Sequence, residues 1–222
     1  SRPALALHQA IQCLLDRFDS VAAAVGWLEE SRVQIIPLDI GGKPGTGHIS
    51  LADASGDSAI VEFLDGQASV HHGSQYTVMA NSPAYEEQLE LLRRYAGLGG
   101  EQPLPGGTDS PDRFARAAFY SERLPTTDDT REAVAYVFSV IRNASAPYGT
   151  ADPVRPNIST TRWRTVADCT DLLYFFESTR SPNVVWARLG GIDFSPGPER
   201  VLDLVAEPDR VGDVTEEFAA AV

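Results

Sequence analysis

The sequence predicts an α+β fold in which two antiparallel sheets face each other and helices cover their outer sides. Three observations carry this prediction: helical periodicity in residues 7–31, alternating apolar runs in 33–80, and a return to strand-like runs in 161–189 after two further helical segments. The chain has 222 residues, of which 43% are hydrophobic, enough for one large domain with a substantial core or, at a stretch, two small ones. We therefore predict a single domain spanning 1–222.

The overall charge excludes one class of partner. The formal net charge is −13, and no cluster of Lys and Arg is present that could neutralise a run of phosphates. No apolar run approaches the roughly 20 residues of a membrane span. We expect a soluble protein that binds neither nucleic acid nor membrane, and both the cytoplasm and the periplasm remain open as its compartment.

The two cysteines, Cys13 and Cys169, lie far apart in the sequence, each inside a pattern of regular structure. That spacing supports neither a disulfide framework nor a zinc site, so we expect two buried thiols. His71 and His72 are adjacent on a predicted strand and would face opposite sides. Because no Cys or carboxylate has ligand spacing to them, we predict no metal, and no phosphate loop or other cofactor motif is present.

Two helices are predicted first. Apolar residues at helical spacing define the first of them: Leu7, Ile11, Leu14, Leu15 and Phe18. Ser20 is the expected N-cap of the second, whose apolar stripe is Val21, Val25 and Leu28. The two should pack as a pair.

The period then changes from helical to strand-like. Five short apolar runs follow one another, each bounded by Gly, Asp, Ser or Pro: 33–38, 48–53, 58–66, 68–72 and 76–80. Tight hairpin turns are expected at 54–57 and at Asp65-Gly66. The runs therefore predict an antiparallel meander in which the order along the chain equals the order in the sheet.

Asn81 stands where the last of these strands meets an acidic helix. We expect Ser82 to be the N-cap and Pro83 the first helical residue, with Glu86 and Glu87 in the first turn. An asparagine amide held rigidly at such a junction is a neutral donor of the kind that stabilises an oxyanion. The alternative is an asparagine that satisfies backbone groups of a loop.

Helices and strands alternate once more in the remainder. Helices are predicted from Ser110-Pro111 onward and after 126–129, separated from the Asn81 helix by a long Gly- and Pro-rich loop that would form a flexible pocket rim. Three antiparallel strands are then expected at 161–169, 172–178 and 183–189. The tail, 190–222, would wrap the surface or mediate association, with Phe194 and Val201 to Val205 as its anchors.

Four segments together resemble the choloylglycine hydrolase and penicillin V acylase family. They are LALHQAIQCLLDRFDSVAAAVGWL (5–28), VMANSPAYEEQL (78–89), LPGGTDSPDRFARAAF (104–119) and TRWRTVAD (161–168). The resemblance runs in order to about Leu189. It implies the four-layer αββα fold of N-terminal-nucleophile hydrolases and hydrolysis of linear amides such as conjugated bile salts, penicillin V or N-acyl homoserine lactones. It also implies a homo-oligomer, a tetramer.

The resemblance leaves the nucleophile outside this chain. In the family a cysteine at the mature N-terminus attacks, with its own α-amine as base, whereas the first helix here resembles the family's middle. Ser1 precedes Arg2-Pro3 and a helix, so it reads as a cap or a cut end, while Cys13 and Cys169 lack a free α-amine. We expect a separate segment to supply the cysteine and this chain alone to be inactive.

The resemblance carries over two site residues. Asn81 matches the family's oxyanion-hole asparagine, and Arg113 matches the arginine that positions the nucleophile electrostatically. The alternative for Arg113 is a surface salt bridge with Asp109 or Asp112. The alternative function is a non-catalytic relative or fragment that binds an acyl ligand or a partner chain.

Overall fold

A computed structural model describes residues 4–31, 33–36, 38–39, 44–45, 47–64, 67–95, 102–149, 154 and 160–221. Its contacts group into two compact units. The first unit comprises Ser1–Leu104 and Ser110–Ala118, and the second comprises Pro105–Asp109 and Phe119–Val222. The single-domain expectation stays a prediction.

The predicted helix pair is present in the first unit. Helix α1 spans Leu7–Arg17 and helix α2 spans Val21–Ser31. Leu14 and Leu28 are buried in one core cluster, as their spacing predicts. Ile11 and Leu15 also belong to the predicted apolar stripe of α1, but their side chains are exposed within this chain.

The meander is confirmed for its three central strands. Strands β5 (His48–Ala52), β6 (Ser58–Leu64) and β7 (Gln67–His72) form one antiparallel sheet in that order. The β5–β6 turn has the predicted tight form, with Gly56 at φ +84° and its amide donating to the Asp53 carbonyl over 3.1 Å. The Asp65-Gly66 turn lies outside the described residues.

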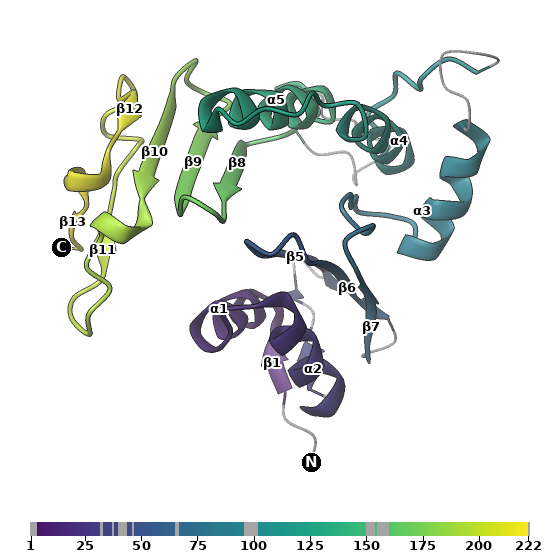
Figure 1. Cartoon of the computed structure of the whole chain (residues 1–222), viewed down its shortest axis with the longest axis horizontal. Helices are drawn as coiled ribbons and strands as arrows, with labels where there is room; N and C mark the ends of the chain where they lie inside the picture. Colours follow the sequence, from purple (N-terminus) through teal and green to yellow (C-terminus); the bar gives the residue numbers. More distant parts are fainter. Residues whose placement is uncertain are drawn as a thin grey trace. The chain divides into compact units, whose positions relative to one another are not determined.

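Strand β6 is buried on both faces. Ala59, Val61 and Phe63 pack with residues of α1 and α2, and Ile60 packs on the opposite side, against Tyr85 and other residues of a second cluster. Figure 1 shows the same arrangement, with α1 and α2 on one side of the sheet and α3 (Tyr85–Leu92) on the other. Alternation along one strand therefore divides the core of the first unit into two parts.

Both ends of the expected meander differ from the prediction. The first run does not join the sheet. Instead β2 (Gln34–Ile36) pairs in parallel with an unpredicted strand, β1 (Ala4–Ala6), and the α1–α2 pair connects the two strands in sequence. Short strands β3 (Leu38–Asp39) and β4 (Pro44–Gly45) pair with each other.

Residues 76–80 form no strand, contrary to the prediction. Their apolar side chains pack on the second cluster of the core. The carbonyl of Tyr76 accepts a hydrogen bond from the Ser58 hydroxyl over 2.7 Å. Side-chain anchoring has therefore replaced the ladder of backbone hydrogen bonds that a strand would need.

The second unit confirms the predicted late helix and three late strands. Helix α5 (Thr130–Asn143) lies across a sheet containing β8 (Trp163–Asp168), β9 (Leu173–Ser178) and β10 (Val184–Arg188) (Figure 1). These strands pair antiparallel in sequence order. Asp129 caps α5 by accepting from the amides of the helix's second and third residues.

The tail adds structure that the sequence did not reveal. Strand β12 (Gly212–Asp213) pairs in parallel with β10, while β11 (Arg200–Val201) pairs with β13 (Ala219–Ala220). The short helix η2 (Leu189–Gly191) precedes β11 in the sequence, and the short helix η3 (Thr215–Glu217) follows β12. Of the expected anchors, Phe194, Val201 and Val205 are exposed, whereas Leu202 and Leu204 are partly buried.

Val214 anchors the tail instead. It is only 2% exposed, and its amide donates to the Trp186 carbonyl over 2.9 Å. This residue is buried where the tail pairs with β10, a contact that apolarity alone does not reveal. Of the helices in the described part of the chain, none combines the length and apolarity that crossing a bilayer would demand.

Asp53 links the β5–β6 turn to α2, and its removal should lower stability. Its carboxylate accepts from the Val21 amide, at the start of α2, and from the Ser55 amide, both over 2.8 Å. Hydrogen bonds from the Ser55 hydroxyl first, and then from these amides, lower the pKa of Asp53. We expect Asp53→Asn to lower the melting temperature at pH 7.

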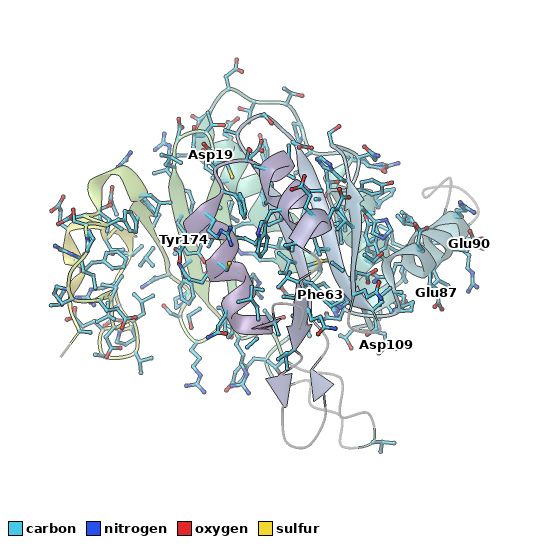
Figure 2. All side chains as sticks on the ribbon, turned by 90° about the horizontal axis from the view of Figure 1, so that it is seen from below. Asp19, Phe63, Glu87, Glu90, Asp109 and Tyr174 are labelled. Carbon is cyan, nitrogen blue, oxygen red and sulfur yellow. The ribbon has the colours of Figure 1, made fainter. Side chains whose placement is uncertain are left out.

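The stabilisation has a defined pH window. Because the folded pKa of Asp53 lies below the ordinary value of about 3.9, the contribution is complete above that pH and is lost as pH falls through the folded pKa. Melts from pH 7 towards pH 3 should show the difference between wild type and Asp53→Asn shrinking. Asp19→Asn, at an exposed position (Figure 2), is the control. A difference that persists unchanged to pH 3 would contradict the role of the ionised carboxylate.

Candidate active site

Asn81 lies on a bend just before α3, with its residue surface exposed. Helix α3 begins at Tyr85, and its N-cap is Ala84, which makes no side-chain capping bond. The predictions of Ser82 as N-cap and Pro83 as first helical residue are therefore wrong. The prediction of Glu86 and Glu87 in the first turn is confirmed.

A buried carboxylate explains where α3 starts. Both side-chain oxygens of Glu62, on β6, lie within hydrogen-bond distance of the Tyr85 amide, at 3.0 and 2.9 Å. An amide at a helix N-terminus has no partner inside the helix, so an acceptor from elsewhere can decide which residue comes first. Here that acceptor comes from the neighbouring sheet and not from the local sequence.

The structure brings Asn81 and Arg113 together. Arg113 belongs to helix α4 (Ser110–Ser121), and its Nη2 donates to Asn81 Oδ1 over 2.7 Å. A guanidinium has only donors, so the asparagine atom that faces it must be the carbonyl oxygen. The amide nitrogen of Asn81 consequently points away from Arg113, with its two N–H groups directed elsewhere.

Two more hydrogen bonds hold the bend that carries Asn81. The Ser82 amide donates to Ser110 Oγ over 2.9 Å, and Gln88 Nε2 donates to the Pro83 carbonyl over 2.6 Å. Gln88 is only 1% exposed, so its bond is made away from solvent. The segment is thus tied to both α4 and α3.

The base of the site is aromatic. Tyr85 and Phe114 are buried and pack edge to face at 6.0 Å, and His71 lies 4.8 Å from the Tyr85 ring. Burial first, then the neighbouring Tyr76, Glu62 and Glu86, raises the pKa of Tyr85 to about 12. Its phenol therefore stays neutral at physiological pH, and its contribution to the site is packing.

Of the remaining sequence candidates that the structure describes, His71 contacts the Tyr85 ring at the base of the site. His71 faces Glu86, while His72 bonds to Asp57 over 2.8 Å, so the pair is divided between different partners. Within the described ranges, no three His, Cys, Asp or Glu side chains gather as a metal site requires. Cys13, on α1, and Cys169, just after β8, are both partly buried. Ser1 and residues 97–100 lie outside the described ranges.

Sequence reasoning missed Glu62 and Gln88. For Glu62 a signal was present, since it is the one charged residue in the apolar run 58–64 of a strand expected at the centre of the meander. Gln88 carries no such signal, because a glutamine within a helix reads as a solvent-facing residue. Its burial follows from how α3 packs. Glu87 and Glu90, on the same helix, are exposed (Figure 2).

Phe114→Ala should destabilise the protein strongly. The side chain is 3% exposed and contacts Tyr85, so its removal leaves a cavity under the site at a cost of about 3–5 kcal/mol. Urea denaturation followed by circular dichroism would measure the loss. Tyr120→Ala, an aromatic truncation at an exposed position of α4, is the control and should cost far less. Equal losses would contradict this packing.

The chain is similar to known proteins along most of its length. In an alignment 219 positions long, the chain is 40% identical to penicillin V acylase of Pectobacterium atrosepticum, and the match covers 91% of this chain and 58% of that protein. It thus spans little more than half the length of that relative. The solved structure of penicillin V acylase from Agrobacterium tumefaciens is 43% identical, has a TM-score of 0.86, and matches all of this chain and 69% of its own.

A more distant structure shares the fold. A variant of conjugated bile acid hydrolase from Clostridium perfringens has a TM-score of 0.70 at 18% identity, with 87% of this chain and 65% of that one covered. These likenesses confirm the predicted α+β, N-terminal-nucleophile hydrolase fold class. Residues 3–194 match the family of linear amide C–N hydrolases, choloylglycine hydrolase family. The chain therefore belongs to the choloylglycine hydrolase family.

Proposed function

We propose that this chain supplies the oxyanion donor of an acylase that hydrolyses linear amides, with Asn81 as the donor and Arg113 as the cation that orients it. The observation that carries the proposal is the hydrogen bond from Arg113 Nη2 to Asn81 Oδ1. Membership of the linear amide hydrolase family supports the reaction type.

Asn81 acts on the charge that develops during the reaction. Attack on an amide carbonyl places negative charge on its oxygen, and a donor already aimed at that position stabilises it without reorganising. Because Arg113 occupies the carbonyl oxygen of Asn81, the Nδ2 group is the part of the carboxamide that remains for substrate. Such a donor lowers the barrier by about 2.7–4 kcal/mol.

Arg113 contributes in two ways. It fixes the rotamer and orientation of the Asn81 amide. It also places a permanent positive charge next to the side chain that binds the developing oxyanion. Arg113 is partly buried, on the helix turn that also holds Ser82 through Ser110. A partly desolvated charge acts more strongly than a fully hydrated one.

The proposed nucleophile is a cysteine outside these 222 residues, as the family resemblance implies. Its thiolate adds to the amide carbonyl, the C–N bond breaks, and the amine leaves with a proton. Water then hydrolyses the acyl thioester, releasing the carboxylic acid and restoring the thiol. Cys13 and Cys169 are internal residues of the chain and lack a free α-amine, so neither is the proposed nucleophile.

Penicillin V is the first substrate to test, because two relatives with at least 40% identity bear that name. A panel of penicillin V, a conjugated bile salt and an N-acyl homoserine lactone separates the substrate classes. Mass spectrometry of the purified enzyme should also find a polypeptide that begins with cysteine. If it finds none and no member of the panel is hydrolysed, the chain is a non-catalytic relative and the proposal fails.

Asn81→Ala in the complete enzyme should lower kcat by about a hundredfold or more, because the oxyanion loses a donor. Steady-state hydrolysis of the best substrate in the panel measures the effect. Asn143→Ala, at the exposed end of α5, is the matched control and should leave kcat unchanged. A near-normal rate for Asn81→Ala would rule out the oxyanion role.

Arg113→Ala should lower kcat by roughly tenfold to a hundredfold, since the amide it orients would lose its fixed direction. The melting temperature should stay close to that of wild type. Arg93→Ala removes an exposed arginine that pairs with Glu90, and it serves as the control in the same unit. A fall in melting temperature that matches the fall in activity would assign Arg113 a structural role instead.

A further inference from the structure

We propose that Glu62 is a positioning residue for Asn81: its buried carboxylate binds the start of α3 and so fixes the bend that presents the Asn81 amide. This inference rests on the proposed function. It adds a residue that lies on the central strand of the sheet, away from the surface on which Asn81 stands.

The hydrogen bond between Glu62 and the Tyr85 amide is strong and shielded from solvent. Glu62 is 1% exposed, and its two oxygens lie 3.0 and 2.9 Å from the amide of Tyr85, the first residue of α3. Charge-assisted bonds to a helix N-terminus are among the stronger hydrogen bonds in proteins, and the helix dipole adds to this one. Exclusion of water strengthens the interaction further.

One face of β6 holds both ends of the segment that carries Asn81. Ser58, Ile60 and Glu62 alternate with the residues that face α1 and α2, so all three lie on the side of α3. Ser58 Oγ donates to the Tyr76 carbonyl at the beginning of the segment. Glu62 accepts from the Tyr85 amide at its end. Strand β6 is thus a rigid support to which both ends of the segment 76–85 are bound.

A purely structural role explains Glu62 poorly. Burying a carboxylate in the centre of an apolar strand is costly, and an apolar residue there would stabilise the sheet at no such expense. On the neighbouring strand β5, His48 Nδ1 lies 3.3 Å from Glu62 Oε1. The carboxylate is better explained by what it holds in place.

Gln88 provides an independent clamp on the same bend. Its Nε2 binds the Pro83 carbonyl, while its buried Oε1 has no hydrogen-bond partner. A buried acceptor without a partner is destabilising, so Gln88→Met should remove the clamp and still fold, with a similar side-chain volume. This variant separates positioning from stability.

The first test is Glu62→Gln in the complete enzyme, with the folded fraction counted by titration of the active site. The variant keeps the shape but loses the charge and one acceptor oxygen. We expect kcat to fall by roughly tenfold or more, with KM changed less than about twofold, because a displaced donor affects the transition state more than the bound substrate.

Glu177→Gln is the matched control. Glu177 is also buried, at 8% exposed, and it pairs with Arg142 over 2.8 Å and Arg164 over 3.1 Å in the second unit. This substitution should lower the melting temperature and leave kcat of the folded enzyme unchanged. If both variants lose stability and neither loses kcat, Glu62 is structural and the inference is overturned.

A double mutant identifies the residue through which Glu62 acts. If Glu62 works by holding Asn81, then Glu62→Gln should cost no further activity in an Asn81→Ala background. Independent, multiplied losses would overturn the positioning role while leaving the oxyanion role of Asn81 intact. Full activity of Asn81→Ala alone would instead overturn the proposed function, so the two failures are distinguishable.

Gln88→Met decides the matter if Glu62→Gln does not fold. We expect it to lower kcat about tenfold with little change in melting temperature. Hydrogen exchange should show faster exchange of backbone amides in residues 81–88 in that variant. Normal kcat together with unchanged exchange would mean that the bend needs no clamp, and the inference would fall.

Discussion

The hydrogen bond between Arg113 and Asn81 is the interaction on which the site depends. A carboxamide can present either its oxygen or its nitrogen. The nitrogen donates hydrogen bonds that stabilise an oxyanion, whereas the oxygen would repel it. A guanidinium accepts no hydrogen bond, so its presence settles the choice in favour of an outward-facing Nδ2 group. The proposed chemistry follows from this single orientation.

Strand β6 connects that surface interaction to the core. Its alternating residues serve two clusters, so the strand is packed on both faces and has little freedom to shift. Hydrogen bonds from Ser58 and to Glu62 bind the two ends of the segment bearing Asn81 to this rigid strand. Preorganisation of this kind keeps the cost of reorganising a donor out of the reaction step.

The sequence anticipated part of this site. Asn81 and Arg113 could be named because their surrounding motifs are specific to a family. Glu62 was detectable in principle as a charge within an apolar run, but its partner was not, because the Tyr85 amide lies 23 positions away in the chain. Helix periodicity and capping rules consider only residues close in the sequence. They therefore predicted Ser82 as the N-cap and could not include Glu62.

The sequence by itself determined the elements whose signals are local: the α1–α2 pair, the β5–β6–β7 meander, helix α5 and the three strands β8 to β10. Periodicity of 3.6 or 2 is a property of neighbouring residues, so it can be recognised without knowing their tertiary partners. Only the tertiary structure decided that α3 starts at Tyr85, that 76–80 is no strand, that Val214 anchors the tail, and that Asn81 meets Arg113. Each of these depends on a partner distant in sequence, whose position local patterns do not encode.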